Sequence, residues 1–271
     1  MNPPAPGPAG GSRFELPVGQ LPEAGSPSTE LPRPDVALAI AAHPDDAEFA
    51  CGATLARWAE AGCAVFELVL TDGQKGTWEP DSDPAALAAA RRVEQQQAAS
   101  LLGVASVDFL GLTDGELQSG LAERRLVCAA IRRIRPDVVL GHDPWRRYRL
   151  HPDHRHAGWL TVDGVVAARD PAFFPDLGLP PHRPRTLLLF EPDQPNHVEP
   201  ASPEHLDRKV RALLAHQSQL RSTMGIDPAA TPEEVEAARA AFRDAVVRQA
   251  AQHGALAGLS AGEAFHRIEP L

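Results

Sequence analysis

The segment from Val36 to Gly52 reads VALAIAAHPDDAEFACG, and it indicates the fold more directly than any other stretch of the chain. Its first five residues, Val36 to Ile40, form a continuous apolar run, which is typical of a strand buried on both faces of a sheet. The polar turn His43-Pro44-Asp45-Asp46 follows, and the pattern then changes to that of a helix that runs to about Ala61. A buried strand, a polar turn and a helix in this order predict the first unit of an α/β domain.

The alternation of strands and helices continues along the chain. Short apolar runs that predict strands are separated by longer segments that predict helices. Further strands are expected at 64–70, 107–110, 138–140 and 186–190, and helices at 84–102, 121–135, 153–169, 203–219 and 232–254. This pattern predicts an α/β fold with a mostly parallel sheet flanked by helices, whose core strands take the order 3-2-1-4-5.

The composition divides the chain into three parts. Residues 1–34 are rich in Pro, Gly, Ser and Glu, and they cannot bury enough surface to offset their ordering entropy. A disordered N-terminal tail is therefore predicted there. The α/β domain is expected over 35–225, and residues 226–271 are expected to form a C-terminal helical extension.

The overall composition excludes some classes of function. A formal net charge of -10 argues against nonspecific nucleic-acid binding, which needs a basic face. No apolar run is long enough to span a membrane, and no basic-then-apolar leader is recognised, so no membrane partner is expected. The three cysteines, Cys51, Cys63 and Cys128, have neither metal-site nor disulfide spacing, which favours a cytoplasmic location. A homo-oligomer is left open.

Polar clusters follow the predicted strands, and the richest two follow the first and the fourth strand. The first is His43-Pro44-Asp45-Asp46, and the second is HDPWRRYRLHPDHRHAG, from His142 to Gly158, which holds four of the 11 histidines. In a sheet of order 3-2-1-4-5, these two strand ends flank the crevice in which ligands bind. The sequence therefore predicts that both His-Pro-Asp motifs belong to one site.

The residue types at this site indicate a metal. Adjacent carboxylates such as Asp45 and Asp46 repel each other unless a proton or a cation separates them. Neutral imidazole and carboxylate are ligands of zinc, and a catalytic zinc has three protein ligands and one open position. His43, Asp46 and one histidine of the second cluster supply that set. His154 is favoured over His156, which would point to the other side of a helix.

A simpler interpretation competes with the metal site. The first cluster can be a helix cap with a solvated histidine, and the second can be a surface loop. The presence of both clusters at adjacent strand ends favours the metal. For His142 two roles stay open, because this residue can line the pocket or simply end its strand.

At this point the chain resembles a known family, the zinc-dependent N-deacetylases of the PIG-L/LmbE type. The resemblance rests on Ala42-His43-Pro44-Asp45-Asp46 and on His151-Pro152-Asp153-His154-Arg155. It covers residues 35–219, and weaker motifs support it. These are Leu70-Thr71-Asp72-Gly73 with Lys75-Gly76, Arg91-Arg92-Val93-Glu94, Asp114-Gly115-Glu116-Leu117 and Ala215-His216-Gln217-Ser218-Gln219.

The resemblance implies a Rossmann-like fold and the removal of an acetyl or other acyl group from the nitrogen of an amino sugar or glycoconjugate. It also implies that His43, Asp46 and His154 bind one Zn²⁺ ion per chain, with Fe²⁺ as the alternative ion. Asp45 is then the general base that acts on a metal-activated water.

Further roles follow from the same resemblance. His151 is expected to carry a proton or to polarise the carbonyl, and Asp153 to orient His151. Arg91 and Asp114 are expected to hold sugar hydroxyls. The proton for the departing amine is left open between Asp45 and His151.

Two other functions remain as alternatives. The same site can cleave the amide of a thiol conjugate of the mycothiol type, which makes an amidase the second choice. A non-catalytic metal-binding protein of the same fold ranks last, because such a protein is expected to lose its base while Asp45 is present here.

Overall fold

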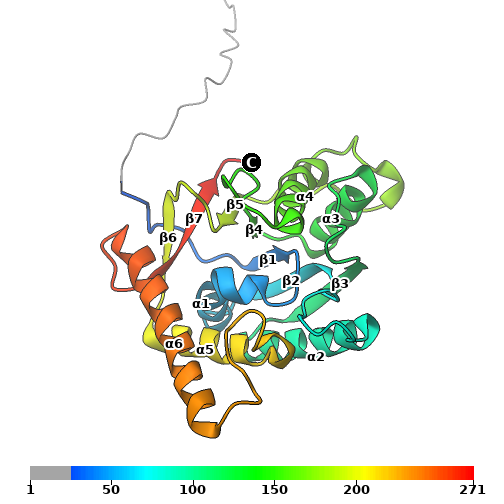
Figure 1. Ribbon diagram of the computed structural model, residues 1–271. Coiled ribbons are helices and arrows are strands. Elements are labelled where there is room, and N and C mark those ends of the chain that lie inside the picture. Colours follow the sequence, from blue (N-terminus) through cyan, green and yellow to red (C-terminus); the bar gives the residue numbers. More distant parts are fainter. Residues whose placement is uncertain (1–25) are drawn as a thin grey trace, which may run out of the picture.

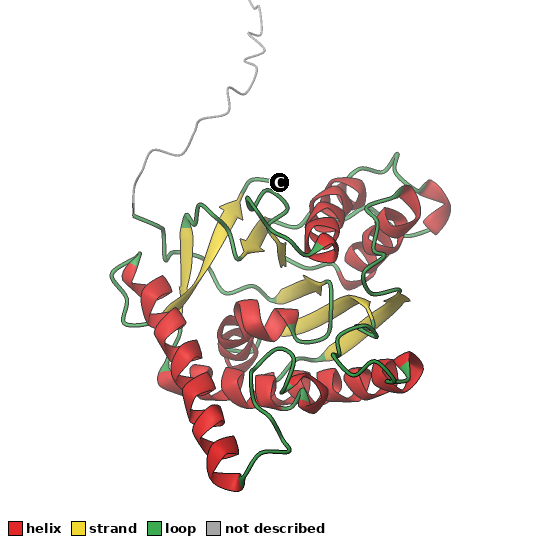
Figure 2. Cartoon of the chain, viewed as in Figure 1, coloured by secondary structure: helices red, strands yellow, loops and turns green. Residues whose placement is uncertain are grey.

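The computed structural model describes residues 26–271, which form a seven-stranded sheet with helices on both faces (Figures 1 and 2). The strands are β1 (Val36–Ala41), β2 (Ala64–Thr71), β3 (Ser106–Leu112), β4 (Val138–His142), β5 (Thr186–Phe190), β6 (His197–Pro200) and β7 (Gly262–Ile268). The helices are α1 (Asp46–Glu60), α2 (Pro84–Leu102), α3 (Leu121–Ile134), α4 (Pro152–Arg169), α5 (Pro203–Leu214) and α6 (Pro232–Ala255), with two short 3₁₀ turns at Pro175–Leu177 and Gln217–Gln219.

The strand order explains where a ligand can bind. The order is β3-β2-β1-β4-β5-β7-β6, and the pairs among the first five strands are parallel. The predicted mostly parallel sheet and its core order 3-2-1-4-5 are therefore confirmed. The direction of winding reverses between β1 and β4, so the segments that leave these two strands diverge and open a crevice at the carboxyl edge.

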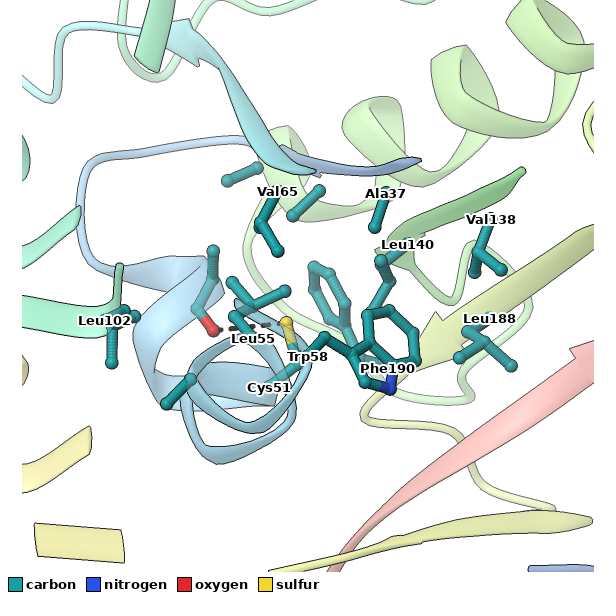
Figure 3. Close-up of a cluster of buried hydrophobic side chains, with 14 of the residues drawn as sticks. Ala37, Cys51, Leu55, Trp58, Val65, Leu102, Val138, Leu140, Leu188 and Phe190 are labelled. Atoms are coloured by element: carbon teal, nitrogen blue, oxygen red, sulfur yellow. Dashed lines mark hydrogen bonds between the residues drawn. The ribbon is translucent and has the colours of Figure 1, made fainter. Parts of the chain in front are cut away.

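The central strand β1 is buried on both faces of the sheet, because its side chains pack alternately into two core layers. Ala37 and Ala39 pack in the layer of α1, α2 and α5, whereas Leu38 and Ile40 pack in the layer of α3 and α4. All four side chains are fully buried, which accounts for the continuous apolar run. Figure 3 shows the first layer, in which Trp58 of α1 packs among side chains of the central strands.

The C-terminal segment differs from the predicted helical extension. It contains α6, but it also contains β7, which pairs antiparallel with both β5 and β6 and so belongs to the central sheet. The sequence did not predict β6 or β7. β6 has only four residues, and β7 carries charged residues such as Glu263 and Arg267 in place of an apolar run.

The start of the described chain also packs on the domain. The predicted disordered tail, 1–34, lies mostly outside the described residues, but residues 26–34 do not extend freely. The Ser28 amide donates to the Asn196 carbonyl, the Val198 amide donates to the Ser28 carbonyl, and Leu31 packs against the first core layer. Among the described residues, no helix has the length and apolar character needed to cross a bilayer.

A break in α1 ties the C-terminal segment to the core. The helix is interrupted at Cys51, where φ is -143°. The amides of Ala53 and Thr54 follow this break, and they donate to the Glu263 carboxylate of β7 over 3.1 and 2.7 Å. Lys209 of α5 donates to the same carboxylate over 2.6 Å. This buried cluster joins α1, α5 and β7.

Candidate active site

A cavity of about 500 Å³ opens at the carboxyl edge of the sheet, next to the ends of β1 and β4. The turn between β1 and α1 contributes His43, Asp45 and Asp46, and the start of α4 contributes His151 and His154. The two His-Pro-Asp motifs are 108 residues apart, from His43 to His151, and they meet here as the sequence predicts. Their meeting follows from the parallel pairing of β1 with β4.

Three side chains, those of His43, Asp46 and His154, converge in the cavity, with each Asp46 oxygen next to a different histidine. His43 Nδ1 lies 3.2 Å from His154 Nε2 and 3.4 Å from Asp46 Oδ2, and Asp46 Oδ1 lies 3.1 Å from His154 Nε2. Ligands about 2.0–2.2 Å from a tetrahedral zinc ion are separated by about 3.3–3.5 Å. Two imidazoles and one carboxylate are ligands that zinc accepts, and their pairwise distances of 3.1–3.4 Å are close to this range. Two overlapping groups could also hold a metal ion, namely His43 with His151 and His154, and Asp46 with His142 and His154.

The surroundings of Asp46 keep it ionised. Burial by itself would raise the pKa of Asp46, but the nearby imidazoles of His154 and His142 outweigh burial and hold the pKa well below its ordinary value. Asp46 Oδ2 also accepts a hydrogen bond from the His43 amide over 2.8 Å. An ionised carboxylate with a fixed orientation is what a metal ligand requires.

Asp45 faces the same cavity but stands apart from these three donors. Its backbone is in the left-handed region, with φ at 97°, which is uncommon for a residue other than glycine and is found at functional sites. Its carboxylate lies 3.2 Å from Arg91 Nη2. Burial, opposed by Arg91, raises the pKa of Asp45 to about 7. A carboxyl group with such a pKa can accept and release a proton near neutral pH.

His151 and Asp153 occupy different environments. His151 is exposed, and its ring stacks on that of His154 with the centroids 4.7 Å apart. Partial burial of the ring and the neighbouring His43 and His154 lower the pKa of His151. Asp153 is fully buried, and its carboxylate accepts from the amides of Gly115 over 2.6 Å and Leu117 over 3.2 Å.

The contact of Asp153 differs from the predicted one. Asp153 Oδ2 lies 3.2 Å from Nε2 of His43, and no hydrogen bond joins Asp153 to His151 within residues 26–271. Asp114 Oδ1 lies 3.1 Å from the same nitrogen. Two carboxylates therefore orient the His43 ring so that its Nδ1 points to the donor cluster, because a ligand histidine is commonly held by its second nitrogen.

Asp114 and Arg91, the predicted substrate contacts, both line the cavity. Burial would raise the pKa of Asp114, but its hydrogen bond to His43 lowers the pKa to about 2. Arg91 is buried, and it donates to the carbonyls of Gly73 over 2.9 Å and Pro44 over 2.5 Å. Arg91 therefore supports the turn that carries Asp45.

Both motifs of this site lie within a segment that is similar to known proteins. The family model described as PIG-L, GlcNAc-PI de-N-acetylase, matches residues 38–165, which include both motifs. A diacetylchitobiose deacetylase from Thermococcus kodakarensis is 37% identical over 185 residues, which are 67% of this chain and 69% of that protein. The chain belongs to the PIG-L family.

Other members of the PIG-L family and their structures are also similar. A 1D-myo-inositol 2-acetamido-2-deoxy-alpha-D-glucopyranoside deacetylase from Streptomyces avermitilis is 34% identical, and the match covers 53% of this chain and 57% of that protein. The N,N'-diacetylchitobiose deacetylase of Pyrococcus horikoshii has a TM-score of 0.76 at 28% identity, over 87% of this chain and 84% of that one. The predicted family is confirmed, and with it the enzyme class, an amide hydrolase that acts as an N-deacetylase.

Several residues at this PIG-L site were not recognised in the sequence. His142, which was left open, lies with Nε2 3.2 Å from Asp46 Oδ2 and so supports a donor of the cluster. Glu191 lines the cavity, has a φ of 55° and pairs with Arg149, whose side chain is only 6% exposed. Glu191 directly follows the apolar run 186–190, which is the same signal that marked the other strand ends. Gln95 lies one helical turn after Arg91, on the same face of α2.

Proposed function

We propose that this protein hydrolyses the N-acetyl or N-acyl amide of an amino sugar or glycoconjugate, with a zinc ion held by His43, Asp46 and His154. One observation supports the proposal most directly. The side chains of His43, Asp46 and His154 make pairwise contacts of 3.1–3.4 Å, with one Asp46 oxygen next to each histidine, and a fourth group, Asp45, faces the same cavity outside this cluster. This division gives one aspartate to the metal and leaves its neighbour free as a base.

The roles of the protein groups follow from their positions. When bound, zinc would supply a Lewis acid and lower the pKa of a water towards about 7. Asp45 takes the proton of the attacking water through its carboxylate. His151 stands at the rim of the cavity, where an imidazole N–H can donate to the carbonyl oxygen as negative charge develops on it. Asp45 or His151 then supplies the proton that the departing amine needs.

The lining of the cavity supports a substrate rich in hydroxyl groups. Asp114 and Glu191 offer hydrogen-bond acceptors to a molecule in the cavity, and Lys75 offers a donor. The names of the relatives from Thermococcus kodakarensis and Streptomyces avermitilis both describe N-acetylated sugar substrates. These observations favour an N-acetylglucosamine derivative. A thiol conjugate that contains such a sugar is the second candidate, because the inositol-linked relative is compatible with it.

A comparison of Asp45→Asn with Asp46→Asn tests the proposal. Asp45→Asn should keep about one zinc ion per chain and lose about 10²–10⁴-fold in turnover, because asparagine is similar in shape but cannot take a proton. Asp46→Asn should bind zinc more weakly, because a charged ligand becomes neutral. Added zinc should therefore restore part of the activity of the Asp46 variant only.

The measurements are acetate release from N-acetylglucosamine derivatives and metal content per chain. Rescue by zinc of the Asp45 variant alone would mean that ligand and base are exchanged. Release of a larger acid from a thiol conjugate, without acetate release from simple sugars, would favour the amidase. A zinc-loaded protein that hydrolyses none of these amides would favour a non-catalytic metal-binding role.

Two further features of the proposal are the identity of the metal and the compartment. Zinc is proposed over Fe²⁺ because two imidazoles and one carboxylate form an open three-ligand site. A cytoplasmic location rests on Cys51, Cys63 and Cys128, which are free and buried.

A further inference from the structure

The backbone of Asp45 depends on one side chain of α2. Asp45 is buried and has a positive φ, so its amide needs an acceptor and its conformation needs support. The amide donates to Oε1 of Gln95 over 2.8 Å. Gln95 is itself fully buried and does not line the cavity, so it reaches the reaction only through Asp45.

Two buried carboxylates determine which way the Gln95 amide faces. Gln95 Nε2 donates to Glu48 over 2.6 Å and to Glu67 over 2.8 Å, and both glutamates are buried. These two bonds use both N–H groups of the side chain. The reversed orientation would place the amino group against the Asp45 N–H, donor against donor. The carboxylates therefore hold the oxygen of Gln95 towards Asp45.

A second residue of the same helix face completes the support. Arg91 lies four residues before Gln95, and its guanidinium donates to the Pro44 carbonyl and to the Asp45 carboxylate. We infer that Gln95, oriented by Glu48 and Glu67, is a positioning residue that holds Asp45 in its left-handed conformation and so aims its carboxylate at the reacting water. This inference rests on the proposed role of Asp45 as the base.

The test compares Gln95→Met with Gln96→Met. Methionine keeps the length of glutamine but removes the acceptor for Asp45, whereas Gln96 is the exposed neighbour on the same helix and serves as the matched control. Gln95→Met should lower kcat by about 10²-fold, because a displacement of about 1 Å in a catalytic group has this effect. KM and the zinc content should stay within about twofold of the wild type, and Gln96→Met should change none of the three.

A second variant separates positioning from stability. Gln95→Glu keeps an acceptor for the Asp45 amide but adds a third carboxylate beside Glu48 and Glu67, so it should melt at a lower temperature than Gln95→Met. It should nevertheless keep kcat within about tenfold of the wild type. If Gln95 only stabilised the fold, the less stable Gln95→Glu variant should have a lower kcat than Gln95→Met. The comparison therefore separates positioning from stability even where Gln95→Met folds poorly.

Two results would overturn the inference. One is a folded, zinc-loaded Gln95→Met protein with the kcat of the wild type, and the other is a kcat loss for Gln95→Glu as large as for Gln95→Met. The proposed function fails separately, since it is contradicted when the wild-type protein itself releases no acid from any N-acyl substrate.

Discussion

Replacement of Lys209 by methionine should strongly destabilise the fold, although Lys209 lies outside the donor cluster. Lys209 Nζ donates to Glu263 over 2.6 Å, and the two side chains are only 4% and 2% exposed. Methionine fills a similar volume but leaves the Glu263 carboxylate buried without its counter-charge. Breaking a buried pair in this way costs about 3–5 kcal/mol. For a domain of this size, that corresponds to a fall in melting temperature of roughly 6–20 °C.

The control is an exposed ion pair that also involves α5. Arg243 of α6 donates to Asp207 of α5 over 2.7 Å, and these side chains are 47% and 40% exposed. Arg243→Met should change the free energy of unfolding by less than about 1 kcal/mol, because water screens such a pair. Urea unfolding of both variants and of the wild type measures the difference.

A double variant tests whether the loss of stability comes from the buried Glu263 charge that Lys209→Met leaves unpaired. Glu263→Gln removes the buried charge while its amide oxygen can still accept from Ala53 or Thr54. Lys209→Met combined with Glu263→Gln should therefore be more stable than Lys209→Met alone. The reasoning is refuted if Lys209→Met and Arg243→Met are equally stable, or if the second substitution lowers stability further by its full single-variant effect.

Three further predictions concern the metal, the pH and the N-terminus. A chelator should remove about one equivalent of divalent metal and abolish activity while the circular dichroism of the sheet persists, because the two core layers do not include the metal donors; loss of folded signal at the same chelator concentration would contradict this. Burial lowers the pKa of His197 to about 4 from 6.5, so the unfolded chain binds the proton first and stability should fall by up to roughly 3 kcal/mol as the pH drops from 6.5 to 4; His197→Gln should flatten that part of the stability profile, and an unchanged slope counts against it. Removal of residues 1–25 should barely change the melting temperature, given their composition, whereas removal of residues 1–34 should lower it because the contacts of Ser28 and Leu31 are lost; equal melting temperatures would show that those contacts contribute little.

That the side chains of His43, Asp46 and His154 line one cavity could be predicted because they follow buried strands in the sequence. His43, Asp46 and His154 each lie next to an element whose apolar pattern is unambiguous, and a parallel sheet brings such strand ends to one edge. The partner of Asp153 could not be predicted in this way. Asp153 contacts His43 and not His151 because of the orientation of the His43 ring and because backbone amides of the loop after β3 hold the Asp153 carboxylate. No spacing in the sequence encodes these features.

The contacts of the C-terminal segment also could not be predicted from the sequence. Charged side chains such as those of Glu263 and Lys209 are rarely buried without a partner, so the sequence carries no local signal that these two are buried. Lys209 and Glu263 lie 54 residues apart in the chain, and Ala53, which follows the break in α1 and also donates to Glu263, is 210 residues from it. Only the folded chain makes the burial of these charges favourable, so β7 was not recognised as a strand of the sheet.

The sequence by itself determined the fold class, the core strand order and the residue types at the crevice, because apolar periodicity and strand ends are local properties of the chain. The tertiary structure alone decided which nitrogen of His43 faces the donor cluster, that Arg91 contacts the Asp45 carboxylate, and that Gln95 accepts a hydrogen bond from the Asp45 amide. These details depend on the packing of α2 and α4 against the turn after β1. Distances of about 3 Å between atoms far apart in the chain are set only when that packing is complete.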